Sequence, residues 1–474
     1  MLRHTKIVAT LGPASSTQEI LERLVQAGID VVRMNFSHGT VEDHLARAAG
    51  IRAAAAKFGR TIGILGDLQG PKIRVSKFEN DKITLVDGEN FILDAQCTLG
   101  NQERAGLDYK ELPKDVRVDD VLLLDDGRLK LIVTSVRGTE IHTRVLVGGE
   151  LSNNKGINRQ GGGLSAPALT GKDMDDIKTA ALIGVDFVAV SFPKGAADMY
   201  MARQLLRAAG SNAVLIAKIE RVEAVNNLEE ILEASDGVMV ARGDLAVEIG
   251  DAAVPALQKR MIRMARDRNK LSIIATQMME SMIQSPIPTR AEVSDVANAV
   301  LDGTDAVMLS AETAAGKYPV ETVESMARIC IEAERSSECT LEREFLDRVF
   351  TRIDQSIALA AIWTSHHLNV KAIASLTQSG STALWMSRLN CGVPIYALTP
   401  DNVSVGRMAL YRGVCPLLMS QMNDDRDLLL AEAEQLLIDR NVIASGDLIV
   451  LTAGEPVGCT GGTNTLKIVR VGGH

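Results

Sequence analysis

The chain has 474 residues, of which 46% are hydrophobic and 23% charged, and its formal net charge is -9 at pH 7. This length predicts about three domains, and the negative charge argues against a nucleic-acid partner, which needs a basic face. No apolar run approaches the roughly 18 residues of a membrane-spanning helix, so we expect no membrane partner. The six scattered cysteines and the absence of a signal peptide predict a cytoplasmic protein.

Short apolar runs recur along the chain, and most of them precede a helical pattern. Near-continuous Val, Ile, Leu and Ala in such a run predict a strand that is buried on both faces, as in a parallel sheet. Eight strand–helix units predict a closed (β/α)8 TIM barrel. The runs span residues 6–10, 30–35, 61–67, 186–192, 213–220, 237–244, 272–277 and 305–312.

The pattern changes between the third and fourth runs. Residues 70–165 hold short alternating runs split by Gly, Asp and Asn, which predict a small inserted β-barrel lid. The tract GGGLSA at 161–166 follows no buried strand, so we interpret it as a hinge rather than a dinucleotide site. From about residue 345, strands and helices alternate as in a doubly wound α/β domain. The predicted domains are a barrel at 1–69 and 167–344, a lid at 70–166 and an α/β domain at 345–474.

Polar residues follow most of the predicted barrel strands, at the ends where barrel enzymes carry their active sites. Residues two apart on a strand share a face, and several of these polar residues are so spaced. An ordinary surface explains any one of them, but not the charges inside the buried tracts AKIE and ARGD, where isolated ions are costly. The set comprises Arg33, Asn35, Ser37, Asp67, Lys218, Glu220, Arg242, Asp244, Thr276, Gln277, Ser310 and Glu312.

Two carboxylates in this set have the character of metal ligands. Glu220 and Asp244 suit Mg²⁺, which takes one or two carboxylates and completes its shell with water and substrate oxygens. A structural Lys–Glu–Arg–Asp network is the alternative. Arg33 and Lys218 add positive charge, and the parts together suit transfer of a phosphoryl group. The sequence contains no Walker A motif, which argues against a P-loop enzyme.

A hydroxyl-rich loop, TQSGST at 377–382, lies between a predicted strand and a predicted helix of the third domain. Such a loop at a helix N-terminus can hold an anion, and a simple turn is the alternative. We expect a pocket for a sugar-phosphate or nucleotide effector here, and a second Gly-rich loop follows at 458–464. The candidate effector residues are Thr377, Gln378, Ser379, Gly380, Ser381 and Thr382.

Several strings resemble the pyruvate kinase family, in the family's order and over nearly the whole chain. They are VVRMNFSHG, GDLQGPKIR, AKIE, MVARGDLAVEI, ATQMMESM, DGTDAVMLSAET and GGTNTLKIVRV. The resemblance implies a Mg²⁺- or Mn²⁺-dependent enzyme that transfers the phosphoryl group of phosphoenolpyruvate to ADP, giving pyruvate and ATP in glycolysis. It also implies a homotetramer that a phosphorylated metabolite activates.

The resemblance implies roles for the matching residues. Lys218 would stabilise the phosphoryl group in flight, and Arg33 would grip it. Glu220 and Asp244 would hold the metal, and Thr276 would lie close to the route by which the enolate is protonated. Gly243 and Thr276 would touch the substrate, and Ser310 and Glu312 are further catalytic candidates. The candidates for contact with the nucleotide are Asn35, His38, Arg74 and Lys155. A monovalent-cation site would be formed by Asn35, Ser37 and Asp67. From its loop position alone, His38 is more simply a solvent-exposed residue.

One segment departs from the family pattern. Where many members have Glu this chain has Lys72, and where many have Thr it has Leu68. The ammonium of Lys72 would stand where K⁺ otherwise sits. We therefore expect an enzyme that does not require K⁺.

Two other interpretations explain part of the pattern. A metal-dependent aldolase acting on pyruvate-like enolates would account for Glu220 and Asp244, but for neither the inserted lid nor Lys218. A non-catalytic sensor of phosphorylated metabolites would bind through the loop at 377–382. Loss of Lys218 or of a metal ligand would mark such a sensor, and this chain has Lys218, Glu220 and Asp244.

Overall fold

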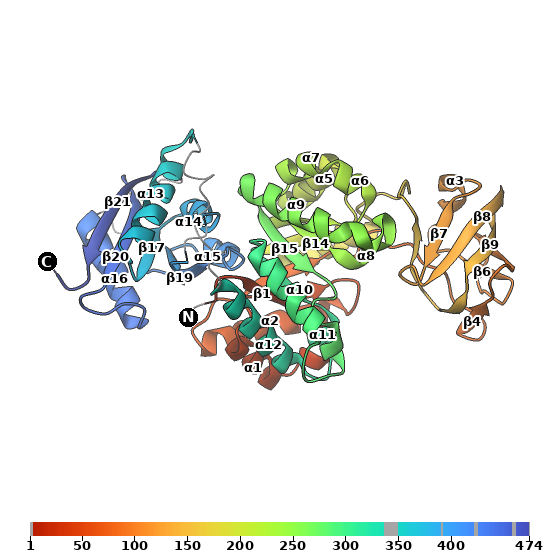
Figure 1. Ribbon diagram of the computed structural model, residues 1–474, viewed down its shortest axis with the longest axis horizontal. Coiled ribbons are helices and arrows are strands. Elements are labelled where there is room, and N and C mark those ends of the chain that lie inside the picture. The colour runs from red at the N-terminus through yellow and green to blue at the C-terminus, as the bar shows by residue number, and fades with distance from the viewer. Residues whose placement is uncertain (1–2, 336–348, 390–391, 421–424, 457–460, 474) are drawn as a thin grey trace.

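The computed structural model describes residues 3–335, 349–389, 392–420, 425–456 and 461–473. These residues form three parts in a row, with the barrel in the middle and the lid and the α/β domain at opposite ends (Figure 1). The expected domain boundary at 344–345 and residues 458–460 of the second Gly-rich loop lie outside the described residues. Across the described ranges, no helix is long and apolar enough to cross a membrane.

Eight parallel strands close into a barrel, which confirms the fold predicted from the apolar runs. The strands are β1 (Lys6–Thr10), β2 (Val31–Asn35), β3 (Gly63–Asp67), β12 (Phe187–Val190), β13 (Val214–Ile219), β14 (Gly237–Ala241), β15 (Leu271–Ala275) and β16 (Ala306–Leu309). They follow one another around the barrel in chain order, and β16 pairs back with β1. Most of their residues are buried, because helices cover the outside and side chains fill the interior.

Four of the helices around the barrel begin at threonine caps. The hydroxyls of Thr17, Thr40, Thr170 and Thr289 each accept a hydrogen bond from a backbone N–H of the first turn, which satisfies one of the free donors of that turn. The helices are α1 (Gln18–Ala27), α2 (Val41–Lys57), α4 (Gly171–Ile183), α5 (Ala196–Ala208), α6 (Val222–Asn226), α7 (Leu228–Ala234), α8 (Arg242–Ile249), α9 (Val254–Asp267), α10 (Arg290–Leu301), α11 (Ala311–Ala314) and α12 (Pro319–Glu334), with short 3-10 turns at Pro13–Ser15, Asp251–Ala253 and Glu280–Ile283.

The insertion after β3 is an all-β unit with its own hydrophobic core. Its elements are β4 (Lys82–Leu85), β5 (Asn90–Asp94), β6 (Arg104–Gly106), α3 (Leu112–Asp115), β7 (Val121–Leu124), β8 (Leu129–Arg137), β9 (Glu140–Val147), β10 (Gly149–Ser152) and β11 (Ile157–Arg159). The strands pair as a six-stranded sheet, β11-β7-β8-β9-β5-β6, and a separate ribbon, β10-β4, rather than as one closed barrel. The tract at 161–166 leads back to the barrel, and its three glycines all have positive φ.

The third part is an α/β domain. Its elements are α13 (Ile353–His367), β17 (Ala372–Leu376), α14 (Ser381–Ser387), β18 (Ile395–Thr399), α15 (Asn402–Met408), β19 (Val414–Leu418), α16 (Arg426–Asp439), β20 (Leu448–Gly454) and β21 (Thr463–Arg470). The sheet order is β19-β18-β17-β20-β21, with β21 antiparallel at the edge. Lys6 Nζ, at the start of β1, donates to Val414 O at 2.6 Å, and Arg388 pairs with Asp305, just before β16. The domain therefore packs on the end of the barrel where the strands begin.

Candidate active site

Four charged side chains form a continuous network at the carboxyl ends of the barrel strands. Arg33 Nε donates to Asp67 Oδ2 at 2.6 Å. Lys218 Nζ lies 3.2 Å from Asp67 Oδ1 and 3.0 Å from Glu220 Oε1. Because Asp67 and Glu220 are each only 1% exposed, both cations are held against buried carboxylates. Lys218 lies near the end of β13 and Glu220 directly follows the strand, and the two side chains meet at the barrel mouth.

Burial and neighbouring charge together set the protonation of this network. Burial opposes the charge of Asp67, but Arg33 and Lys218 outweigh it and hold the pKa of Asp67 below its usual value. Burial also opposes the ammonium of Lys218, yet Asp67 and Glu220 raise its pKa. Burial raises the pKa of Glu220, and Asp244 adds to that rise although Lys218 opposes it. Lys218 therefore stays cationic, while a cation beside Glu220 would favour its charged form.

Two residues after β12 support the network, and the sequence analysis missed both. Lys218 Nζ donates to Ser191 Oγ at 2.7 Å, and the backbone N–H of Phe192 donates to Glu220 Oε2 at 2.8 Å. Phe192 has φ +54°, a left-handed conformation that costs a non-glycine residue about 1–3 kcal/mol. The expectation that polar residues at the ends of barrel strands serve the active site, applied to the run at 186–192, would have identified Ser191. No sequence pattern signals the backbone contact of Phe192.

The predicted strand at 237–244 ends earlier than expected. β14 stops before Arg242, and Arg242, Gly243 and Asp244 form the first turn of α8. Arg242 Nη1 donates to Asp295 Oδ1 at 2.8 Å, and its Nη2 donates to Thr276 O at 2.7 Å. The expectation that Arg242 and Asp244 share a strand face is therefore wrong, because the chain bends into a helix at Arg242. Arg242 anchors the neighbouring loop.

Thr276 lies in that loop in a strained conformation. Its φ is +67°, and that of Gln277 is +54°. Thr276 Oγ1 donates to Ala275 O at 2.6 Å and accepts from the backbone N–H of Gly243 at 2.9 Å. Strained non-glycine residues persist where the surroundings hold them, and they cluster at functional sites. The hydroxyl of Thr276 is thereby fixed beside Gly243 at the barrel mouth.

Ser310 and Glu312 also lie beyond their strand, which ends at Leu309. Glu312 is 2% exposed, and its two oxygens accept from the backbone N–H groups of Ser310 at 2.7 Å and Met279 at 3.2 Å. Burial raises the pKa of Glu312, and these two N–H groups oppose the rise. Glu312 therefore joins the loops that follow β15 and β16. The expectation that Ser310 and Glu312 continue the strand is wrong, because the chain turns into α11 after Ser310.

A cavity of about 570 Å³ separates the lid from α8. Gly243, Asp244 and Thr276 line it from the barrel, and Lys130 lines it from the lid. No motif in the sequence marks Lys130, which is one of many exposed residues on alternating strands. The other lining residues are Lys72, Leu123, Asp126, Gly127, Gln160, Ala246, Val247, Gly250, Asp251 and Gln277.

The two lid residues predicted to meet the nucleotide lie outside the lining of this cavity. Lys155 Nζ pairs with Asp125 Oδ1 at 2.7 Å. Arg74 forms an isolated β-bridge with Gly156, and its backbone N–H donates to Asp108 Oδ1 at 2.7 Å. Arg74 therefore lies in the segment between barrel strand β3 and lid strand β4, and Lys155 lies between the lid strands β10 and β11.

The residues of the predicted monovalent-cation site are neighbours. Asn35 and Asp67 stand opposite each other in the β2–β3 register, and Asn35 Oδ1 accepts from the backbone N–H of Ser37 at 3.1 Å. His38 is exposed in the following loop, as its position predicts. Lys72 Nζ, in contrast, lies 3.0 Å from Asp244 Oδ1. In this structure its charge faces a predicted metal ligand.

The hydroxyls of the loop at 377–382 face two directions. Thr377 Oγ1 accepts from the backbone N–H of Gly380 at 2.9 Å, and the Thr382 hydroxyl bonds that of Thr463 at 2.6 Å. Ser379 Oγ donates to Ser381 Oγ at 3.4 Å, and both serines line a groove against the barrel. The loop therefore does not present all of its hydroxyls to one pocket. Gln378 contributes a backbone carbonyl, which accepts from the hydroxyl of a residue in α15.

The chemistry of the mouth fits a hard divalent cation. Within the described ranges, no three His, Cys, Asp or Glu side chains gather as a metal cage. The candidate centre therefore depends on Glu220 and Asp244, close enough that the charge of Asp244 raises the pKa of Glu220. Mg²⁺ commonly uses one or two carboxylates and takes its remaining ligands from water and substrate.

Comparison with known proteins identifies the family. The family model described as pyruvate kinase, barrel domain, matches residues 2–323, and that described as pyruvate kinase, alpha/beta domain, matches residues 355–469. The chain is 54% identical to pyruvate kinase II of Salmonella typhimurium over 99% of both chains, and 53% identical to the pyruvate kinase of Haemophilus influenzae over 96% of both. It is 40% identical to the pyruvate kinase of Mycobacterium tuberculosis over 100% of this chain and 99% of that one. The chain therefore belongs to the pyruvate kinase family, whose members are phosphotransferases of glycolysis.

Proposed function

We propose that this chain transfers the phosphoryl group of phosphoenolpyruvate to ADP, giving pyruvate and ATP. The observation that carries the proposal is the position of Lys218, which lies between the buried carboxylates of Asp67 and Glu220 at the barrel mouth. Arg33 shares Asp67 with it, so two cations stand close together. Phosphoryl transfer depends on positioning and on neutralising charge across the equatorial oxygens, which this pair supplies.

We propose that Glu220 and Asp244 hold Mg²⁺ or Mn²⁺. When bound, the metal would neutralise negative charge on the substrate oxygens. Lys218 and Arg33 would bind the phosphoryl oxygens, and Gly243 would contact the substrate. The fixed hydroxyl of Thr276 would lie near the enolate carbon that is protonated to give pyruvate. Ser310 and Glu312 would act by holding the loops after β15 and β16 in place.

We propose that ADP occupies the cavity between the lid and α8. Closure of the lid, residues 70–166, would bring Arg74 and Lys155 toward the phosphates and exclude water. Asn35 and His38 would complete the nucleotide site from the β2 side. The tract at 161–166 is the proposed hinge, which its glycines with positive φ support.

We propose that activity does not require K⁺. The support is the ammonium of Lys72, which stands 3.0 Å from Asp244 Oδ1 and supplies a permanent positive charge at the mouth. Asn35, Ser37 and Asp67 remain the residues that would hold a monovalent cation. Asp67 already pairs with Arg33 and Lys218, so little negative charge at this position is left without a partner.

We propose four further properties. A sugar phosphate or nucleotide would activate the enzyme through the loop at 377–382, and the active form would be a homotetramer, which light scattering on a sizing column tests. A cytoplasmic location agrees with the three cysteines of the described residues, which are free. The domain boundaries are those expected from the sequence, at residues 69–70, 166–167 and 344–345.

Replacing Lys218 tests the proposed activity. Pyruvate formation from phosphoenolpyruvate, ADP and Mg²⁺ should fall by at least about a hundredfold in Lys218→Met, because a preorganised charge at the transferred group is lost. Lys178→Met is the matched control, since Lys178 is an exposed helix residue whose ion-pair partner among the described residues is Asp175, on the same helix. Circular dichroism should show that both variants fold.

Two outcomes would contradict the proposal. Equal loss in Lys218→Met and Lys178→Met would show that the effect is not specific to the mouth. The second outcome is folded wild-type protein that forms no pyruvate, even with Mg²⁺ and a panel of sugar phosphates and nucleotides. This result would favour the sensor or the aldolase interpretation.

A further inference from the structure

We propose that Asp173 is a positioning residue that joins the two segments connecting the lid to the barrel. The lid stands beside the barrel (Figure 1), and the chain enters it after β3 and returns from it before α4. Asp173 lies in the first turn of α4 and is fully buried. Its carboxylate contacts both segments, so one side chain fixes the places where the lid insertion begins and ends.

The carboxylate of Asp173 accepts hydrogen bonds from each side of the insertion. On the entering side, the backbone N–H of Gly70 donates to Asp173 Oδ1 at 3.0 Å. On the returning side, the backbone N–H of Thr170 donates to Asp173 Oδ2 at 2.8 Å, and the Thr170 hydroxyl donates to the same oxygen at 2.6 Å. Gly70 and Asp173 are 103 residues apart, so the bond between them closes the lid insertion into a loop.

A helix cap alone does not account for the burial of this carboxylate. Thr40 and Asp43 form the same kind of capping box at the start of α2, and Asp43 is exposed there. Burying a carboxylate is costly unless hydrogen bonds replace its water. At Asp173 the N–H of Gly70 supplies a donor from outside the helix. The burial of Asp173 therefore reflects its bond to Gly70 as well as the cap.

The bond from Gly70 also fixes Lys72, two residues further along the chain. Gly70 O accepts a hydrogen bond from the backbone N–H of Lys72 at 3.0 Å. Lys72 Nζ in turn lies 3.0 Å from Asp244 Oδ1 at the barrel mouth. Asp173 thus acts on the mouth through Gly70 and Lys72, without contacting a reacting group itself.

The same loop fits closely against the residue that supports Lys218. Leu68 O accepts from the hydroxyl of Ser191 at 2.7 Å, and this hydroxyl accepts from Lys218 Nζ at 2.7 Å. Gly70 has φ +66°, and a Cβ at that position would lie 2.7 Å from Ser191 Cβ. The loop can therefore pass this point only with a glycine in a left-handed conformation. Its middle is held by Asp173 and its start by Ser191.

Fixed attachment points should make closure of the lid easier. Lys72 and the lid residue Lys130 both line the cavity in which we place ADP. A lid on fixed points loses less conformational entropy on closing than a lid on freer connections. The bond between Gly70 and Asp173 should therefore favour binding of ADP over that of phosphoenolpyruvate, whose proposed contacts lie on the barrel. This kinetic consequence rests on the proposed function, whereas the bond itself does not.

Asp173→Ser separates the bond to Gly70 from the helix cap. Ser15 holds the matching position of the turn at Pro13–Ser15, and its hydroxyl accepts from the backbone N–H of Gly12 at 3.0 Å. Asp173→Ser should likewise keep the bond from the N–H of Thr170, while its shorter side chain does not reach Gly70. We expect the Gly70 amide to exchange its hydrogen faster in this variant. Hydrogen exchange with fragmentation mass spectrometry resolves that single amide.

Steady-state kinetics of Asp173→Ser give the second measurement. The KM for ADP should rise by about tenfold, because ordering the backbone of one freed residue costs a free energy of that order. The KM for phosphoenolpyruvate should stay unchanged. Asp173→Asn still offers a carbonyl oxygen to Gly70 and should keep a KM for ADP closer to that of wild type.

Two control variants isolate the contribution of the cap. Thr170→Val removes the capping hydroxyl and leaves the bond between Gly70 and Asp173 in place. It should lower the melting temperature, as loss of a cap does, without changing exchange at Gly70 or the KM for ADP. Asp43→Ser makes the same substitution in the exposed box of α2 and should also leave both quantities unchanged.

Three results would overturn the inference. They are exchange at Gly70 that is as fast in wild type as in Asp173→Ser, a KM for ADP that stays unchanged or rises together with that for phosphoenolpyruvate, and the same changes in Thr170→Val as in Asp173→Ser. If Asp173→Ser does not fold, wild type still decides, because fast exchange at Gly70 would exclude the bond and slow exchange supports it. Hydrogen exchange needs no turnover, so failure of this bond and failure of the proposed kinase activity are distinguishable.

Discussion

Lys72 Nζ lies 3.0 Å from Asp244 Oδ1, so a permanent positive charge faces one of the two proposed metal ligands. Both side chains are partly exposed, at 31% and 21%, which limits the contribution of the pair to stability. Its position matters more for catalysis, because the ammonium is present whether or not a monovalent cation is available.

Reversing this charge should create a requirement for K⁺. In Lys72→Glu a carboxylate replaces the ammonium beside Asp244, and two like charges about 4 Å apart repel by about 4 kcal/mol near a protein surface. We expect pyruvate formation in K⁺-free buffer to fall at least tenfold, because about 1.4 kcal/mol in the activation barrier corresponds to a tenfold change in rate. Added KCl should restore part of it. A steady-state assay over a KCl series measures both effects.

Wild type and Lys178→Glu are the controls for this series, because Lys178 lies on an exposed helix face. Both should be insensitive to KCl at constant ionic strength. Strong stimulation of wild type by KCl, with no response to choline chloride, would show that the Lys72 ammonium does not replace the cation.

The ion pair between Arg388 and Asp305 should be important for holding the α/β domain on the barrel. The side chains are 4% and 1% exposed, and Arg388 Nη1 also donates to Lys270 O at 2.9 Å. Arg388→Met leaves Asp305 buried without its cation, which costs about 3–5 kcal/mol. We expect a lower urea midpoint in an equilibrium unfolding experiment. Arg388→Met/Asp305→Asn should recover part of the loss, and no recovery would contradict a charge-based origin.

The barrel could be predicted from sequence because its signal is local. Each strand is a short apolar run, and each of the eight runs overlaps one strand of the closed barrel. The strand ends were less predictable. Arg242 and Ser310 continue the alternating pattern, yet the chain turns there, and the loop after β15 contacts both Arg242 and Glu312.

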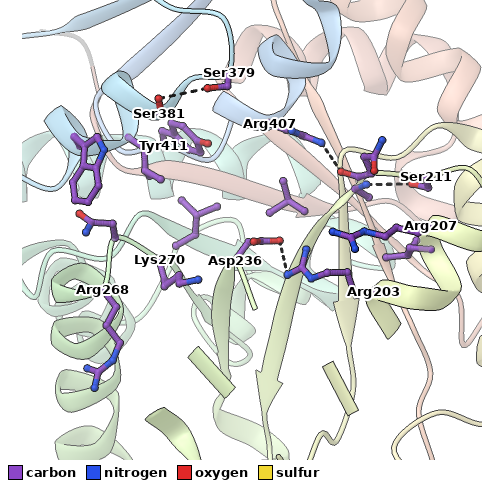
Figure 2. Close-up of a pocket in the computed structure, with 18 of the residues that line it drawn as sticks. Arg203, Arg207, Ser211, Asp236, Arg268, Lys270, Ser379, Ser381, Arg407 and Tyr411 are labelled. Atoms are coloured by element: carbon purple, nitrogen blue, oxygen red, sulfur yellow. Dashed lines mark hydrogen bonds and ion pairs between the residues drawn. The ribbon is translucent and has the colours of Figure 1, made fainter. Parts of the chain in front are cut away.

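Several contacts in and around the site join residues that are far apart in the sequence. Lys72 and Asp244 are 172 residues apart, and no local pattern pairs them. The groove between the barrel and the α/β domain (Figure 2) likewise combines arginines from α5 with serines of the loop at 377–382, which the sequence placed in separate domains. Lys218 and Glu220 were accessible to sequence reasoning because they lie two residues apart at the end of one strand.

The hydroxyl of Thr276 should matter more than its methyl group. Its Oγ1 accepts from the backbone N–H of Gly243 at 2.9 Å and thereby fixes the loop that has φ +67° at Thr276. Thr276→Val removes that acceptor, and positioned proton-transfer groups contribute about a hundredfold or more to rate. We expect kcat to fall on that order while Thr276→Ser keeps most of it. Equal values of kcat in the two variants would contradict a role for the hydroxyl.

Glu248 should make stability depend on pH at the junction of α8 and the lid. Burial raises its pKa from 4.5 to about 7, although the N–H of Val222 and the charge of Arg221 oppose the rise and Glu223 adds to it. Because the folded pKa exceeds the unfolded value, the folded state binds the extra proton, and the associated stability is lost as pH rises from about 4.5 through about 7. The shift corresponds to a penalty on the order of 3 kcal/mol above pH 7.

Glu248→Gln keeps an acceptor for Val222 and does not titrate, so it should raise the melting temperature at pH 8 and change it little at pH 5. The difference between the two melting temperatures, followed by calorimetry from pH 5 to 8, should grow through this window; a difference independent of pH would show that Glu248 does not titrate there.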